Sequence, residues 1–366
     1  MFPDGHLPLY RAALAHPHRA TIRVQVWSGE DLLVPDLPVV GGQVKATLTN
    51  RVARTCEVVV DESWFPWHDD DPLAELGNEL HAWRGVELGN GRRIEFPVFR
   101  GRIQKTRMPD RAVTVSCVDY AGDVVDAEFE QPENSNPANR VGQEIRRLIT
   151  QARQDAVFDD ATGVDEPVPA MTWETDRGRA LDDLAASAGA FWYPLADGRF
   201  TVRKVPWAQP PPDPSTVEIL ADGPGGIVES SSVERSREQI VNAVTVVAER
   251  LDGSSPAAYT ARDLDPGSAT YYFGRFGRKA RTLSIPAAGG QPQCRAAAET
   301  FLARTLARRF AWEVTCVPDG SIELGDVTRL RARGRDVQHV VAGYTMPLTT
   351  AGAMTIQLRQ FTPGLV

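Results

Sequence analysis

The stretch LDDLAASAGAFWYPLADGRFTVRKV, residues 181–205, predicts a helix that is followed by a β-hairpin. Asp176 stands just before it, where a residue able to cap a helix is favoured, and Gly189 stands where a left-handed residue commonly ends one. Asp197-Gly198 then separates two apolar runs, which is a strong signal for a hairpin turn. Apolar residues recur at helical spacing in the first half: Leu181, Leu184, Ala185 and Ala188. The stretch therefore predicts a compact helix–hairpin unit in the middle of the chain.

A second helix is predicted on the N-terminal side of this stretch, over VGQEIRRLITQARQDA (141–156). The polar connector EQPENSNPANR (130–140) precedes it, and the proline-rich spacer WAQPPPDPST (207–216) follows the hairpin. One face of the helix is apolar and is formed by Val141, Ile145, Leu148, Ile149 and Ala152. We therefore expect a small α+β domain at 127–212.

Residues 20–126 read as a series of short strands. Runs such as ATIRVQVW (20–27) and RTCEVVVD (54–61) alternate apolar and polar residues or are rich in β-branched ones. A long acidic, proline-broken loop (61–82) interrupts them before the strands resume. Roughly six to eight strands in this length are typical of a small antiparallel barrel or sandwich.

The C-terminal part, 213–366, also predicts strands, among them FAWEVTCV (310–317) and AMTIQLRQF (353–361). One amphipathic helix is expected over QCRAAAETFLARTLARRF (293–310), with arginines near its end that suit the negative pole of a helix. Its predicted inward face consists of Ala298, Phe301, Leu302, Thr305 and Leu306. The helix is expected to lie against the second set of strands.

The predicted fold class is therefore mainly β with an α+β insert. We expect four parts: an N-terminal segment (1–19), a first β domain (20–126), the small helix–hairpin domain (127–212), and a second β-rich domain with one packed helix (213–366). Both β domains are expected to be antiparallel barrels or sandwiches.

Composition limits the classes of function that are expected of the chain. The chain has 366 residues with 40 basic and 48 acidic side chains, a net charge of −8, which does not suit a protein that wraps nucleic acid. No run approaches the roughly 20 apolar residues of a membrane span, and the N-terminus lacks a secretory signal. The sequence predicts a soluble, turn-rich, multi-domain protein.

Charge is spread unevenly along the chain. Between Asp119 and Glu166 there are 12 acidic and 4 basic residues, whereas between Arg275 and Arg335 there are 12 basic and 5 acidic residues. Two solvated faces would account for this. The other interpretation is that the acidic middle of one subunit meets the basic end of another, because head-to-tail contacts join unlike surfaces.

The cysteines and histidines do not form a recognisable metal site. Four scattered cysteines, without any Cys-x-x-Cys pair, signal neither a zinc site nor a disulfide framework: Cys56, Cys117, Cys294 and Cys316. Cys56 and Cys117 lie in strand-like runs and are expected to be core thiols. His16-Pro17-His18 lacks further ligands nearby, so an ordinary mobile N-terminal segment is expected. The run His68-Asp69-Asp70-Asp71 does not have the alternate spacing of a calcium loop and predicts a solvated acidic loop.

Motifs for catalysis are also missing. The chain has no Gly-x-Ser-x-Gly elbow, no phosphate-binding loop and no His-Glu-x-x-His helix, and Gly223-Pro224-Gly225-Gly226 lacks a strand–helix context. Trp64 and Trp67 can stack on a sugar or anchor a partner, although packing over their own domain is favoured. We predict no catalytic, cofactor-binding or metal-binding residues and no cofactor, and we do not expect an enzyme.

Four landmarks occur in a fixed order: VFRGRI (98–103) with VTVSCVDYAGDVV (113–125), the helix–hairpin (181–205), SVERSREQIVNAVTVVAE (232–249), and RAAAETFLARTLARR with SIELGDVTRLRA (295–332). In this order the chain resembles the baseplate or tail-tip hub proteins of long-tailed bacteriophages and of related injection machines. The resemblance covers about residues 20–362.

The resemblance implies a homotrimer in which each subunit carries two tube-like β domains. Three subunits would then form a pseudo-sixfold ring that adapts a sixfold tail tube to a threefold tip, closes the tube and passes DNA on infection. The implied partners are a second and third copy, the distal tail protein ring, the tape-measure protein, and receptor-binding or fibre proteins. DNA would pass without sequence-specific binding, and the protein would lie at the tail tip of the virion after assembly in the host cytoplasm.

Many hubs carry a peptidoglycan hydrolase or a spike at the C-terminal end, and neither follows Val366, so cell-wall cleavage is not expected of this chain. Two other functions stay open. One is a carbohydrate-binding or carbohydrate-cleaving protein that uses Trp64, Trp67 and nearby carboxylates. The other is the hub of a non-viral contractile injection system, which neighbouring sheath genes would favour. Neighbouring tape-measure genes would favour a phage.

Overall fold

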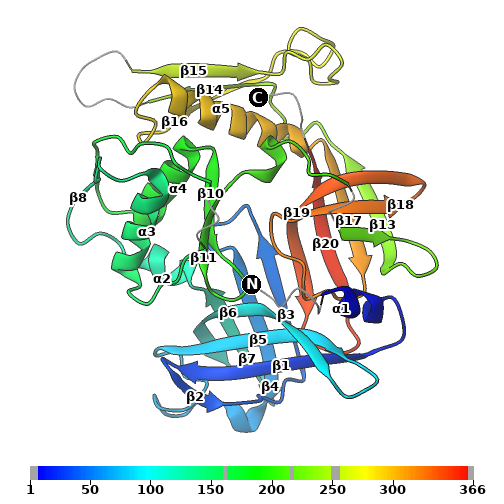
Figure 1. Ribbon diagram of the computed structural model, residues 1–366. Coiled ribbons are helices and arrows are strands. Elements are labelled where there is room, and N and C mark those ends of the chain that lie inside the picture. The colour runs from blue at the N-terminus through cyan, green and yellow to red at the C-terminus, as the bar shows by residue number, and fades with distance from the viewer. Residues whose placement is uncertain (1–6, 160–162, 215–217, 249–255, 362–366) are drawn as a thin grey trace.

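The computed structural model describes residues 7–159, 163–214, 218–248 and 256–361 (Figure 1). Most of its strands join one sheet of 13 strands, which forms the lower and right-hand parts of Figure 1. The main path runs in the order β13 (Val228–Arg235), β17 (Phe310–Cys316), β20 (Met354–Gln360), β19 (Arg335–Pro347), β3 (Gly41–Thr47), β4 (Arg54–Asp61), β7 (Ala112–Asp119), β6 (Arg93–Arg107), β5 (Asn78–Glu87), β1 (Arg19–Ser28) and β2 (Asp31–Val34). Off this path, β18 (Val327–Ala332) pairs with β19 and with β12 (Glu218–Ala221). The predicted mainly β class is confirmed.

The two β regions are hydrogen-bonded to each other through β3 and β19. These strands run antiparallel, with Thr47 opposite Gly343 and Gln43 opposite Pro347. We call this pairing the seam. Because of the seam, the regions expected to be separate barrels or sandwiches share one continuous sheet, and one apolar cluster contains side chains from both, such as Val44 and Tyr344.

The helix–hairpin has the predicted form. Helix α4 (Arg177–Ser187) is capped by the Asp176 carboxylate, which accepts a hydrogen bond from Arg179 N at 2.7 Å, and Gly189 has a φ of +63°. Strands β10 (Ala190–Pro194) and β11 (Phe200–Lys204) form the hairpin. The remaining elements of this region are α2 (Ala121–Asp126), α3 (Val141–Ala152), the short strands β8 (Glu133–Asn134) and β9 (Thr172–Trp173), and the 3₁₀ turn η2 (Pro206–Ala208).

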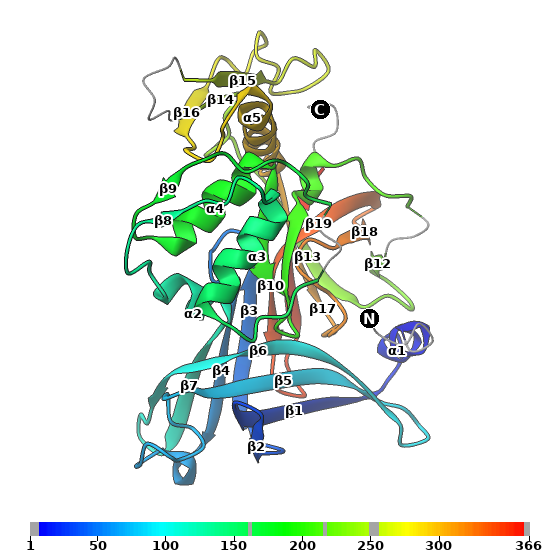
Figure 2. The same ribbon diagram turned by 60° about the vertical axis from the view of Figure 1, so that its left-hand side comes forward.

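Helix α5 (Gln291–Ala307) lies beside this unit as well as beside the strands (Figure 2). It covers a three-stranded sheet of β15 (Ala258–Arg262), β14 (Ala243–Val247) and β16 (Ala280–Ser284). Its predicted inward residues Ala298 and Leu302 share an apolar cluster with α3 and α4, whereas Ala303 and Ala307 pack with Val340 and Phe361 of the second β region. One apolar core therefore includes residues from both 127–212 and 213–366, and the domain boundaries given above stay a prediction.

Part of the N-terminal segment forms a helix that packs against the rest of the chain. Helix α1 (Leu7–Leu14) places Tyr10 against Phe96, with ring centroids 4.7 Å apart, and the Tyr10 hydroxyl accepts a hydrogen bond from Gly320 N at 2.8 Å. Tyr10 is fully buried. The apolar side chains of α1 therefore pack against β6 and the turn before β18, whereas the mobility expected at His16-Pro17-His18 stays a prediction. None of the helices in the described ranges is long and apolar enough to cross a membrane.

Gly42, at the start of the seam, is expected to tolerate no side chain. Its φ is +138°, and a Cβ there would lie 2.3 Å from the carbonyl oxygen of Glu57 on β4. Gly42→Ala should lower the free energy of unfolding by about 2–3 kcal/mol. Gly29→Ala is the matched control, because Gly29 has a φ of +58° in open space and should lose only about 1 kcal/mol. Urea unfolding of both variants measures the difference, and equal losses would contradict close approach as the cause.

Candidate functional site

Arg54 on β4 lies where the two β regions and the helix–hairpin meet. Only 1% of the residue is exposed. Its backbone N–H donates to Asp119 Oδ2 at 2.6 Å, and its guanidinium donates to the carbonyl oxygen of Pro194 at the end of β10. The same guanidinium forms an ion pair with Glu323 and contacts the Tyr344 hydroxyl at 3.4 Å. We call these groups the Arg54 junction; one side chain there ties three parts of the chain together.

Carboxylates near this junction are held in a dry environment. Burial raises the pKa of Asp119 to about 7, although the Arg54 guanidinium and backbone N–H donors favour the ionised form. Burial likewise raises the pKa of Asp326 to about 7. The Tyr193 hydroxyl donates to the carbonyl oxygen of Leu324 at 2.8 Å, and burial raises its pKa to about 12. These groups form hydrogen bonds and ion pairs with one another and with the backbone. Their role is therefore structural.

A second polar cluster joins β5 to the helical side of the molecule. Glu79 Oε2 accepts hydrogen bonds from His81 Nε2 at 3.1 Å and from the Tyr120 hydroxyl at 2.5 Å, while Oε1 accepts one from Arg153 at 2.8 Å. Arg153 also pairs with Asp123 at 2.6 Å and lies 3.6 Å above the ring of Tyr120. We call this set the Glu79 cluster.

The protonation of the Glu79 cluster follows from these contacts. Burial opposes ionisation of Glu79, but the hydrogen bonds from His81, Tyr120 and Arg153 outweigh it and lower the pKa of Glu79 to about 2. Burial lowers the pKa of His81. A carboxylate held ionised by three donors, beside an imidazole that is harder to protonate, stabilises the join between β5 and α3.

The four cysteines are buried and free, which confirms the core position expected of Cys56 and Cys117. Cys56 and Cys117 lie opposite each other in the β4–β7 pairing. Burial raises the pKa of both thiols, so they are poor nucleophiles and poor metal ligands. Within the ranges that the structure describes, no three His, Cys, Asp or Glu side chains gather around one point.

The candidate aromatic and acidic residues of the loop 61–82 do not act as a unit. Trp64, in the 3₁₀ turn η1 (Glu62–Trp64), packs against the sheet core, whereas Trp67 is 72% exposed and rests edge-on against Phe65. Asp71 Oδ2 accepts hydrogen bonds from the backbone N–H groups of Trp67 and His68 at 2.7 and 2.9 Å. The carboxylate therefore shapes the loop, and the two indoles do not form one platform. His18 of the other candidate pair contacts the carbonyl oxygen of His16 through Nδ1 at 2.9 Å.

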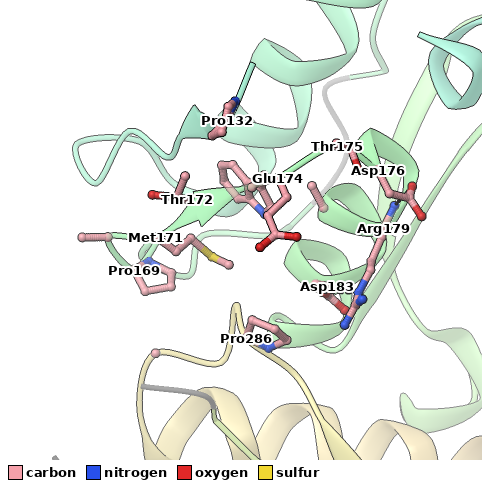
Figure 3. A pocket seen from close by; sticks show the side chains of 14 residues that line it. Pro132, Pro169, Met171, Thr172, Glu174, Thr175, Asp176, Arg179, Asp183 and Pro286 are labelled. Carbon is pink, nitrogen blue, oxygen red and sulfur yellow. Dashed lines mark hydrogen bonds and ion pairs between the residues drawn. The ribbon is translucent and has the colours of Figure 1, made fainter. Parts of the chain in front are cut away.

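A cleft of about 800 Å³ lies between β9, the start of α4 and the turn at 286–289 (Figure 3). Prolines and Met171 line one part of it. Figure 3 shows Glu174, Arg179 and Asp183 extending toward the turn that carries Pro286. A mixed apolar and acidic wall of this kind suits a binding surface. We call it the β9–α4 cleft.

Comparison with known proteins gives the fold a context. No family model and no curated protein sequence matches the chain. Among solved structures, the tail protein from Neisseria meningitidis MC58 is similar with a TM-score of 0.64 at 16% identity, over 93% of this chain and 96% of that one. The 43 kDa tail protein of prophage MuSo2 from Shewanella oneidensis has a TM-score of 0.62 at 13% identity, over 92% and 98%.

A third solved structure, the prophage tail protein gp18 from Listeria monocytogenes EGD-e, is similar with a TM-score of 0.53 at 10% identity, over 94% of this chain and 96% of that one. In all three cases the likeness spans nearly the whole of both chains. The likeness in fold to phage tail proteins that the sequence indicated is confirmed: this chain has the fold of these tail proteins.

Proposed function

We propose that this chain is a structural protein of a phage tail, the hub at the tail tip or baseplate, and not an enzyme. The observation that carries the proposal is the likeness in fold to three phage tail proteins over nearly their full lengths. The two buried polar clusters support it, because their charged groups are consumed in joining parts of the chain.

The hub is a homotrimer that presents six similar β regions to the tail tube. The arrangement of the sheet supports this proposal. On each side of the seam the neighbouring strand is the hairpin partner of the seam strand: β4 for β3, and β20 for β19. Three copies would therefore place six such regions around an axis, and the ring adapts a sixfold tube to a threefold tip.

The partners of the hub are the distal tail protein ring above it, the tape-measure protein, and receptor-binding or fibre proteins around it. The segments 61–82 and 251–280 are the proposed contact surfaces. Residues 78–82 belong to β5 and 258–262 to β15, and residues 251–255 lie outside the described ranges. DNA passes through the ring after infection without sequence-specific binding, and acidic walls favour its passage because they do not hold the phosphate backbone. The protein is located at the tail tip of the virion.

Electron cryomicroscopy of particles made from the complete set of neighbouring tail genes tests the proposal. The expected result is density for three copies of this chain at the end of the tail tube. A gene deletion should give particles without a tail tip, and the cloned gene should restore them. Particles that lack this chain, or normal tails from the deletion strain, would overturn the proposal.

A substitution of Trp67 distinguishes a contact with a tail protein from carbohydrate binding. The exposed indole favours some partner, whether protein or glycan. Trp67→Ala should leave the thermal midpoint unchanged, because the side chain buries little surface, and should reduce tail assembly by about tenfold if the loop binds a tail protein. Leu33→Ala, which removes a half-exposed apolar side chain from β2, is the control. Glycan binding by the isolated wild-type chain, lost in Trp67→Ala together with normal tail assembly, would favour the carbohydrate-binding function instead.

A further inference from the structure

The segment 263–279 is a long surface loop that two buried polar residues hold in shape. Asp263 is 2% exposed, and its Oδ2 accepts hydrogen bonds from the hydroxyls of Ser268 and Thr270, each at 2.6 Å. Asn242, fully buried, donates to the carbonyl oxygens of Thr270 and Gly277 at 2.9 and 2.8 Å and accepts from Lys279 N at 2.8 Å. The loop is therefore set in its shape before any partner arrives, which lowers the entropy cost of binding.

This loop presents aromatic rings with arginines above them. Phe273 is 60% exposed and lies edge-on to Tyr272, with centroids 5.0 Å apart. The Arg278 guanidinium is 5.4 Å from the Tyr272 ring and 5.2 Å from the Phe273 ring, and Arg262 is 5.5 Å from Tyr272. From Arg262 to Arg281 the chain has five basic and two acidic residues, and one of those acids is the buried Asp263. Arginine and aromatic side chains dominate the binding energy of protein interfaces.

The β9–α4 cleft has the opposite character. Glu174, Asp176 and Asp183 line it together with one arginine, Arg179, and the rest of its wall is largely apolar. Arg179 pairs with Asp183 at 3.7 Å, and Arg51 pairs with Asp176 at 3.1 Å. Among the described residues, Glu174 is therefore the acid of the cleft without an ion pair. Trp173 also lines the cleft: the residue is 6% exposed, and among the described residues its indole N–H has no hydrogen-bond partner. A buried donor without an acceptor costs free energy, so this N–H indicates an incoming acceptor such as a peptide carbonyl oxygen.

The loop and the cleft lie on opposite sides of the molecule. In both Figure 1 and Figure 2 the loop that follows β15 projects to the right, whereas β8, and in Figure 2 β9, lie on the left beside α4. They therefore do not meet within one chain. A contact between two unlike surfaces on opposite sides is head-to-tail, and it forms a ring when the rotation from copy to copy closes.

We propose that the loop 263–279 of one copy docks into the β9–α4 cleft of the next copy. This inference rests on the homotrimer of the proposed function and names its contact. Arg278 faces Glu174 and Asp183 across the interface, the exposed Phe273 ring enters the apolar part of the cleft beside Pro169 and Pro286, and a loop carbonyl oxygen accepts the hydrogen bond of Trp173. A second copy is favoured as occupant because the charges of the two surfaces, both on this chain, are complementary.

Photo-crosslinking of the full chain tests the contact. Phe273→p-benzoylphenylalanine should give a crosslink to a peptide within 169–183 of another copy, found by mass spectrometry of the crosslinked band. Trp67→p-benzoylphenylalanine, at an exposed aromatic position in another loop, is the matched control and should give none there. Adding Arg278→Glu should lower the crosslink yield by about tenfold, and adding Glu174→Lys to that variant should restore it. Circular dichroism confirms that each variant is folded.

Light scattering of the same samples separates this inference from the proposed function. Crosslinks to 169–183 in a sample that forms trimers support both. A trimer whose crosslinks lie elsewhere, or whose yield is unaffected by Arg278→Glu, overturns the docking inference and leaves the hub proposal standing. Crosslinks to 169–183 that build only dimers or open chains support the docking contact and contradict the threefold ring. Monomers without crosslinks at any concentration overturn the docking inference.

Discussion

Arg54→Met is expected to lower the free energy of unfolding by about 3–5 kcal/mol, the cost of breaking a buried charged pair by removing one partner. Methionine fills most of the volume, so the loss comes from chemistry and not from a cavity. The Glu323 carboxylate would lose its ion-pair partner, the Pro194 carbonyl oxygen would lose its donor, and the buried Asp119 would lose the favourable charge of the guanidinium. Urea unfolding followed by fluorescence and by circular dichroism measures the change.

Two further variants show whether the cause is the junction itself. Arg54→Lys keeps the charge but not the planar fork, so it should recover only part of the loss. Arg93→Met removes an exposed arginine that pairs with Glu87 at 3.2 Å and should leave the midpoint unchanged. A loss below about 1 kcal/mol in Arg54→Met would show that Arg54 does not hold the three parts together.

Protonation of Glu79 is expected to lower the free energy of unfolding by about 3 kcal/mol between neutral pH and pH 2. The pKa of Glu79 is lowered from 4.5 to about 2 in the folded chain, so the unfolded chain takes up the proton first as the pH falls. The stabilisation is complete above about pH 4.5 and is lost as the pH falls through the folded pKa. Unfolding free energies measured at a series of pH values give this slope.

Asp119 and Asp326 act in the opposite direction at higher pH. Burial raises the pKa of each to about 7, so the folded chain keeps protons that the unfolded chain has released. Their contribution to stability therefore increases as the pH falls from about 7 toward the ordinary carboxyl pKa of 3.8. The two effects together place maximum stability in mildly acidic solution, at about pH 4–5.

Two variants test whether the Glu79 cluster causes the loss of unfolding free energy at acid pH. Glu79→Gln should flatten the limb below about pH 4.5, and Tyr120→Phe, which removes one of the three donors, should flatten it in part. An acid limb in Glu79→Gln as steep as that of the natural chain would show that other carboxylates cause it.

Local features of the fold could be predicted and non-local ones could not. The helix cap at Asp176, the left-handed Gly189 and the Asp-Gly hairpin depend on neighbours within a few residues, and all of them are found. The seam joins Thr47 to Gly343, at opposite ends of the chain. The sequence pattern of β3 or of β19 does not identify the strand with which it pairs, because strand pairing depends on the whole tertiary arrangement.

The polar clusters carried a weaker signal that could have been used. Arg54 has the same parity in β4 as the buried residues Cys56, Val58 and Val60, so alternation alone places its side chain inward. Helix α1 was also signalled, because Leu7, Tyr10 and Leu14 recur at helical spacing. Glu79 had no such signal, because β5 is buried on both faces and carries no simple alternation.

The seam also determines when the sheet can be completed during synthesis on the ribosome. Strand β3 emerges early, yet its partner β19 is made only near the end of translation, so until then the edge of β3 stays open to other chains. Late closure of this kind slows folding and exposes nascent chains to aggregation. Premature termination before Arg335 would therefore leave a product in which one edge of β3 lacks its partner strand.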